Sequence, residues 1–193
     1  MKVFELDAIA NCSNTTLADH IGGRPELDIV VERTVGDDRL NACVRLESTL
    51  LALFRQCHLQ YNLTFILFRG YTPTFNDGDA CTHSCSIEPN TIDDSWEEDL
   101  ECWEEGSSDD YSDSIIETIS NITGLTPQEV ILRNNEQSYT AKNKMGLGYN
   151  TDLSNRLKTD VTEIFGTNFY LYAIYNPHQH EVKFVFIENE QSY

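Results

Sequence analysis

The chain has 193 residues, of which 40% are hydrophobic, and a formal net charge of −19. This length and apolar content allow one domain with a substantial core and exclude wholesale disorder. Glu5 and Asp7 interrupt the apolar run that a signal peptide needs, and no apolar segment approaches the ~20 residues of a membrane span. We therefore expect a cytoplasmic protein without membrane contact, whose six cysteines are reduced thiols.

The first half of the chain contains one strong helix pattern and one strong strand pattern. Residues 1–35 give the weakest signal, with a strand expected over 27–35. Apolar residues at helical spacing over 38–61 predict a long amphipathic helix with Cys43 and Cys57 on its buried side. The β-branched and aromatic residues that follow predict a strand that ends near Pro73.

The C-terminal part predicts two helices and then two strands. Thr126, Pro127 and Glu129 form a capping-box pattern that begins the first helix, and Gly166 ends the second, over 150–165. Two strands follow, joined by an Asn-Pro turn. Because no βαβ rhythm occurs, we expect a single α+β domain over 1–193, with an antiparallel sheet packed with several helices.

The acidic charge is concentrated in one part of the chain. Residues 70–132 contain sixteen Asp and Glu and no Lys or Arg, so this segment carries −16. The other 130 residues hold sixteen acids and thirteen bases, a net charge of −3. Acidic proteins usually mix both signs over their surface, so this asymmetry indicates a role for the negative field.

Within this block, residues 88–124 are expected to form an acidic helical insertion or surface segment. Apolar residues at helical spacing predict one helix over 93–105 and a second between Ser108 and Gly124. The first would be roughly 20 Å long, with a carboxylate about every 2.5 Å, against one charge per ~1.7 Å of duplex DNA. The candidate partner-binding residues are Asp93, Asp94, Glu97, Glu98, Glu101, Glu104, Glu105, Asp109, Asp110 and Asp113.

A second candidate site is the stretch TPTFNDGDACTHSCS, residues 72–86. The NDGD tetrapeptide predicts the turn of a hairpin, and a strand resuming at Ala80 would place Cys81, His83 and Cys85 on one face. The simplest interpretation is a structural turn with two packed cysteines, with neither a catalytic residue nor a metal.

Three chemical alternatives remain open for this stretch. Cys81, His83 and Cys85 could bind zinc if a fourth ligand came from elsewhere in the chain. Asp77, Asp79, Cys81 and His83 could form the catalytic site of a small hydrolase or transferase. Oxygens of Asn76, Asp77 and Asp79 suit calcium, although the spacing of an EF-hand loop is absent.

The same stretch resembles a group of mostly uncharacterised bacteriophage and prophage proteins that carry Y-T-P-x-F-N-D-G-D/E-x-C. The matching residues are Tyr71, Thr72, Pro73, Phe75, Asn76, Asp77, Gly78, Asp79 and Cys81, and Ala80 stands where that group most often has proline. The resemblance implies a phage origin, and so the host cytoplasm, but no catalytic residue. The acidic block is similar in character to phage anti-defence proteins that imitate DNA.

Three functions follow from these patterns. The leading hypothesis is a non-enzymatic inhibitor whose acidic surface occupies a basic site on a host nucleic-acid-handling or defence protein, without binding nucleic acid itself. The second is the small hydrolase or transferase. The third is a structural or assembly protein that forms a homo-oligomer.

Overall fold

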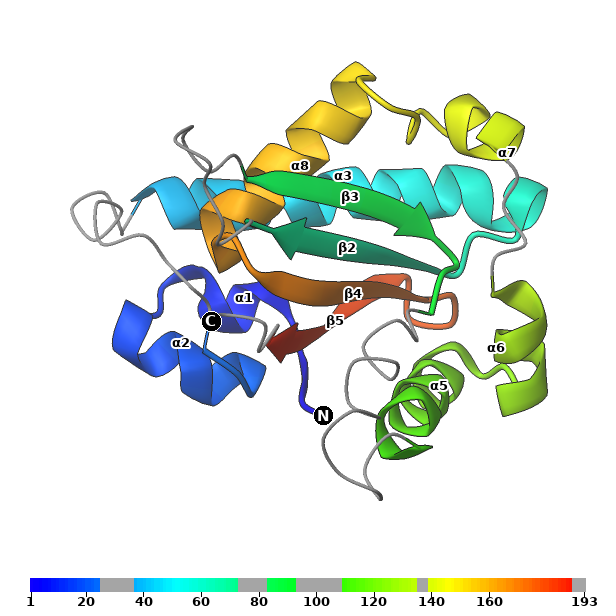
Figure 1. The fold of residues 1–193 in the computed structure, drawn as a ribbon, viewed down its shortest axis with the longest axis horizontal. Helices are drawn as coiled ribbons and strands as arrows, with labels where there is room; N and C mark the ends of the chain where they lie inside the picture. Colours follow the sequence, from blue (N-terminus) through cyan, green and yellow to red (C-terminus); the bar gives the residue numbers. More distant parts are fainter. Residues whose placement is uncertain (25–36, 73–82, 93–108, 135–138, 189–193) are drawn as a thin grey trace, which may run out of the picture.

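A computed structural model describes residues 1–24, 37–72, 83–92, 109–134 and 139–188 (Figure 1). Five strands form one sheet in the order β1-β5-β4-β2-β3, and every neighbouring pair is antiparallel. The strands are β1 (Val3–Phe4), β2 (Phe65–Tyr71), β3 (Ser84–Pro89), β4 (Phe169–Asn176) and β5 (Glu181–Glu188). The described helices are α1 (Leu6–Ala10), α2 (Asn14–Ile21), α3 (Asp37–Tyr61), α5 (Asp109–Thr123), α6 (Pro127–Arg133), α7 (Tyr139–Lys144) and α8 (Asp152–Phe165). The predicted α+β class is confirmed.

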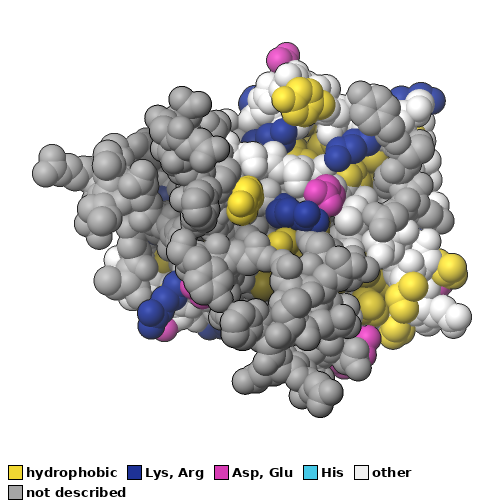
Figure 2. All heavy atoms as spheres, in the orientation of Figure 1, with side chains coloured by type: hydrophobic (Ala, Val, Ile, Leu, Met, Phe, Trp, Pro, Cys, Tyr) yellow, Lys and Arg dark blue, Asp and Glu magenta, His cyan; other side chains and the backbone are white. Residues whose placement is uncertain are grey.

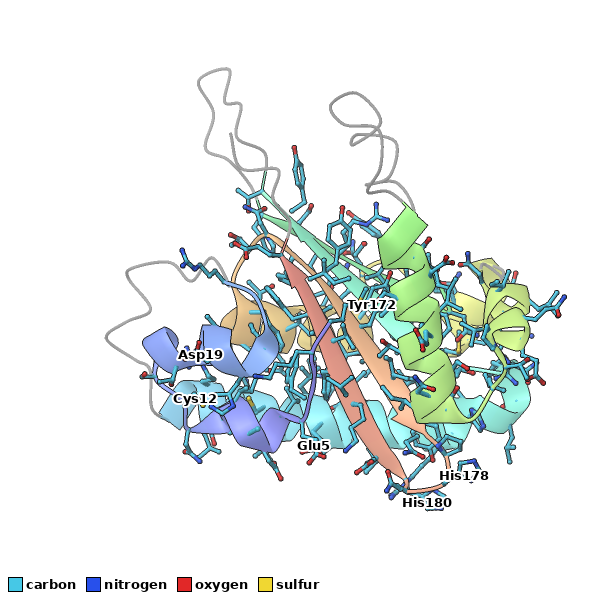
Figure 3. All side chains as sticks on the ribbon, turned by 90° about the horizontal axis from the view of Figure 1, so that it is seen from below. Glu5, Cys12, Asp19, Tyr172, His178 and His180 are labelled. Atoms are coloured by element: carbon cyan, nitrogen blue, oxygen red, sulfur yellow. The ribbon has the colours of Figure 1, made fainter. Side chains whose placement is uncertain are left out.

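The sheet is covered by helices on both faces, because both faces of its central strands are apolar. All eight residues of β4 are buried, and alternate side chains enter two separate cores. The larger core contains α1, α2, α3 and α8 and a group of phenylalanine rings, with Phe165 and Phe186 stacked at 5.7 Å. The smaller core packs α5 and α6 against the other face, with Tyr172 between the sheet and α5 (Figure 3).

Most of the strong sequence patterns are confirmed as elements. The predicted long helix is α3, with both Cys43 and Cys57 buried, and the predicted strand pair is β4 and β5. Thr126 and Glu129 make both hydrogen bonds of the predicted capping box at the start of α6. Helices α1, α2 and α7 and strand β1 come in addition to those predictions. The strand expected over 27–35 and the helix expected over 93–105 lie outside the described residues. Within the described part, none of the helices has both the length and the apolar content for crossing a membrane.

Candidate functional site

The hairpin predicted for residues 72–86 is present at both of its flanks. Strands β2 and β3 pair from Tyr71 opposite Ser84 to Ile66 opposite Pro89. The turn itself, with Asp77, Asp79 and Cys81, lies outside the described residues, so only His83 and Cys85 can be placed. Both lie on the side of the sheet where α8 packs: Nε2 of His83 is 3.2 Å from the Thr162 hydroxyl, and Cys85 packs against the larger core.

The environments of His83 and Cys85 favour a structural role. Burial raises the pKa of the Cys85 thiol to about 12, so the thiolate needed by a nucleophile is disfavoured. Burial also lowers the pKa of His83, whose ring nitrogens lie within hydrogen-bond distance of the Thr72 and Thr162 hydroxyls. Among the described residues, no three His, Cys, Asp or Glu side chains are grouped closely enough to bind a metal ion.

The acidic block is represented in the described residues by α5. Ile115 and Ile119 are fully buried against the sheet, and each such side chain contributes about 1.5–3 kcal/mol by leaving water. Asp113 and Glu117 lie on the outer side of the same helix, exposed and four residues apart. Like charges at this spacing weaken a helix by a few tenths of a kcal/mol. The helix predicted between Ser108 and Gly124 is present, with Ile115 and Ile119 packed on the fold and Asp113 and Glu117 exposed to solvent.

The other candidate partner-binding residues cannot be placed in the same way. Asp109 and Asp110 belong to the first turn of α5, but their side chains lie outside the described set, as do the residues of 93–105.

The described residues on both sides of the acidic stretch 93–108 are held to the fold. On the β3 side, Ile92 donates its N–H to the side-chain oxygen of Asn134 at 2.8 Å. On the other side, α5 ends at Thr123, and Gly124, which has a φ of 76°, leads into the capped α6. A Cβ atom at Gly124 would lie 3.2 Å from His178, in the turn between β4 and β5 that Figure 3 shows beside this helix. Ile92 and α5, which lie on either side of residues 93–108 in the chain, therefore both belong to the smaller core on the α5–α6 side of the sheet.

A basic surface, which the sequence patterns did not single out, lies next to β3, the edge strand of the sheet opposite β1. Residues 133–158 contain five Lys and Arg and two Asp and Glu, so this stretch directly after the acidic block carries +3. The signal was present in the charge sequence but was hidden by the overall charge of −19. Figure 2 shows Lys and Arg side chains gathered over this side of the molecule.

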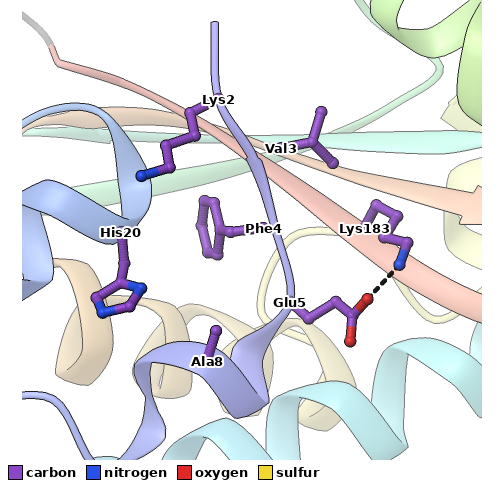
Figure 4. A pocket seen from close by; sticks show the side chains of 7 residues that line it. All are labelled: Lys2, Val3, Phe4, Glu5, Ala8, His20 and Lys183. Atoms are coloured by element: carbon purple, nitrogen blue, oxygen red, sulfur yellow. Dashed lines mark hydrogen bonds and ion pairs between the residues drawn. The ribbon is translucent and has the colours of Figure 1, made fainter.

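A surface cavity of about 300 Å³ opens near the N-terminal strand (Figure 4). Its lining residues are Lys2, Val3, Phe4, Glu5, Ala8, His20 and Lys183. Both of its ammonium groups already have oxygen partners: Lys2 donates to the backbone oxygen of Asp19, and Lys183 pairs with Glu5 and Glu181. The cavity therefore offers no uncommitted cation to a ligand.

Comparison of the chain with protein-family models, curated proteins and solved structures found no match.

Proposed function

We propose that the protein is a non-enzymatic binding protein whose acidic surface occupies a basic site on a nucleic-acid-handling protein. The observation that carries this proposal is the charge of −16 on residues 70–132, set against −3 on the rest of the chain. A surface with this density of negative charge attracts the grooves that normally hold nucleic acid, and it repels nucleic acid itself.

The geometry of α5 supports this function. A helix that served only to cover the sheet could carry charges of both signs on its outer side. Instead Asp113 and Glu117 repeat the same charge, and neither makes an ion pair with a described residue. Their field is therefore directed at solvent and is available to a partner.

The resemblance of residues 71–81 to phage proteins makes the target concrete: a defence or nucleic-acid-processing protein of a bacterial host. The enzymatic alternative gains no support from His83 and Cys85, because His83 is half-buried between two hydroxyl groups and the raised pKa of Cys85 keeps it a thiol.

The test is capture of host proteins on the immobilised protein at low and at high salt, followed by displacement with duplex DNA. We expect a basic partner that is retained at low salt, lost at high salt and released by DNA, because both ligands compete for one site. Capture that is independent of salt and is not displaced by DNA would refute the proposal.

Charge-reversed variants locate the surface. We expect the double variant Asp113→Lys and Glu117→Lys to weaken capture, and the quadruple reversal of Glu97, Glu98, Glu101 and Glu104 to abolish it. The matched control reverses Asp7 and Asp19, two exposed acids in the balanced part of the chain, and should leave capture unchanged. If the control weakens capture as much as the Asp113 and Glu117 pair, total charge rather than this surface is responsible.

A further inference from the structure

The outer edge of β3 offers backbone groups for another strand. The backbone N–H of Asn90 donates to Phe65 O at 2.8 Å, and this pair continues the β2–β3 register in which Ile66 lies opposite Pro89. Hydrogen-bonded and non-hydrogen-bonded pairs alternate in an antiparallel ladder. The backbone N–H and C=O groups therefore bond to β2 at Ser84, Ser86 and Glu88, whereas those of Cys85 and Ile87 point away from β2.

These outward groups are unpaired with respect to the described residues. In the part of the chain that the structure describes, neither the N–H nor the C=O of Cys85 or Ile87 has a hydrogen-bond partner. Two residues of an extended strand span about 7 Å, which is the repeat at which a second extended backbone presents its own donors and acceptors. Addition of a peptide strand to such an edge is a common mode of recognition.

Two lysines lie beside this edge. Lys142, from α7, is half-buried and close enough to Glu88 and Lys158 to interact electrostatically with both. Lys158, from α8, is near Cys85 and has its ammonium group 5.7 Å from the centre of the Tyr149 ring. With respect to the described residues, neither ammonium group makes a hydrogen bond or an ion pair.

The nearby carboxylate does not neutralise this group of cations. Glu88 lies 3.7 Å from Arg69 and also accepts a hydrogen bond from the Ser86 hydroxyl at 2.7 Å. Among the described residues, Glu88 is thus already paired with Arg69, and Lys142 and Lys158 make no ion pair of their own. Two such ammonium groups beside an open backbone edge favour an anionic partner.

We propose that the outer edge of β3 binds an extended acidic segment of a partner protein, which adds to the sheet as a sixth strand and pairs its carboxylates with Lys142 and Lys158. A peptide fits better than a nucleic acid, because only a peptide backbone supplies alternating N–H and C=O groups to Cys85 and Ile87. This edge takes a partner of the opposite charge to the one expected for the acidic residues 93–117, so the inference goes beyond the proposed function.

The overall charge gives this interaction a distinctive salt dependence. The field of the whole protein repels an acidic peptide at long range, whereas the lysines attract it at contact. Salt screens the long-range repulsion over a Debye length of about 8 Å at physiological ionic strength, and it weakens contacts near the surface less. We expect affinity to change little with salt, in contrast to the steep loss expected for the acidic surface.

The probe is a fluorescein-labelled peptide of sequence Thr-Glu-Val-Glu-Val-Glu-Thr, followed by fluorescence anisotropy with the full chain. We expect it to bind, and the same peptide with Gln in place of Glu to bind at least about fivefold more weakly. An analogue N-methylated at alternate residues keeps every charge but cannot donate the ladder hydrogen bonds, so it should bind at least about tenfold more weakly. Amide exchange should slow at Cys85 and Ile87 when the unmodified peptide is added.

The variant pair Lys142→Gln and Lys158→Gln should lower affinity for the acidic peptide at least about fivefold. Its matched control, Lys144→Gln with Arg156→Gln, removes the same charge from exposed positions on the same two helices and should have little effect. Ile87→Pro removes one outward N–H without removing a ladder bond to β2; should it fail to fold, the N-methylated peptide tests the same donor–acceptor pairing from the other side.

Three results would overturn the proposal. The first is the absence of binding by the acidic peptide. The second is binding that N-methylation does not weaken, which would show charge attraction without strand addition. The third is competition with the peptide by a single-stranded oligonucleotide of ten thymidines. If binding of that oligonucleotide also depends on Lys142 and Lys158, the edge is a phosphate-binding surface.

Discussion

Asn90 joins the end of β3 to the start of β2, and we expect its replacement to be among the most damaging single changes to the stability of the fold. The residue is fully buried and has a φ of 48°. Its side-chain oxygen accepts hydrogen bonds from Thr64 N at 2.9 Å and Phe65 N at 3.2 Å, and its amide nitrogen donates to Asn62 O at 2.9 Å. One side chain therefore satisfies three backbone groups.

The cost follows from those groups. Asn90→Gly leaves two buried N–H donors without a partner, at about 1–3 kcal/mol each, or roughly 2–6 kcal/mol in total. The carbonyl oxygen of Asn62 keeps its hydrogen bond from the Thr64 hydroxyl, at 3.0 Å, and so adds little to the cost of the substitution. Asn90→Ala loses the same bonds and also places a Cβ in the left-handed region, which costs about 1 kcal/mol more.

Asn150 supplies a matched control. It has a φ of 60° but is exposed, and its side chain makes no hydrogen bond to the described residues. Asn150→Gly should be nearly neutral, and Asn150→Ala should cost only the backbone term of about 1 kcal/mol.

Urea denaturation followed by far-ultraviolet circular dichroism measures all four variants. Equal m-values would show that the same surface is exposed on unfolding in each case. If Asn90→Gly costs no more than Asn150→Gly, the hydrogen bonds of the Asn90 side chain do not hold the two strands together and the reasoning is wrong.

Three further predictions concern titration, reactivity and capping. The pKa of His83 is lower in the folded protein than its unfolded value of about 6.5. The stability that the neutral ring contributes is therefore present above about pH 6.5 and is lost as the pH falls through the folded pKa. His83→Asn should flatten the decline of stability between about pH 7 and 5, and an unchanged slope would contradict this. Cys85, whose pKa is raised to about 12, should resist iodoacetamide at about pH 8 in the native protein and react faster once the protein is unfolded in urea, as mass spectrometry of the peptides would show. Equal rates in the native and unfolded protein would contradict this. Thr126→Ala removes the cap of α6 and should cost about 1 kcal/mol in urea denaturation, whereas Thr126→Ser should cost clearly less.

Elements defined by local interactions could be predicted from the sequence. The capping box at Thr126 involves residues only three apart, and the strands joined by the turn at His178 and His180 are adjacent in the chain. By contrast β1 is two residues long and exists only because Val3 and Phe4 lie opposite Val185 and Phe184 of β5. A pairing between residues about 180 positions apart leaves no local pattern from which it can be predicted.

The two candidate surfaces differ in the same way. The acidic face of α5 was predictable because helical spacing separates Ile115 from Asp113 within one turn. The edge of β3 was not, because the outward direction of Cys85 and Ile87 depends on the register with β2. Likewise Lys142 and Glu88 are brought together by the fold and not by the chain.

The position of β4 sets the order in which the molecule can assemble during its synthesis. β4 lies between β2 and β5 and is buried along its whole length, so the sheet cannot close until residues 169–188 have left the ribosome. By then the acidic block has long been translated, and Ile115 and Ile119 have had no completed surface on which to dock. The nascent chain thus carries its sixteen acids before the sheet is complete. We expect their mutual repulsion to oppose association between neighbouring chains that still expose the phenylalanines of the larger core.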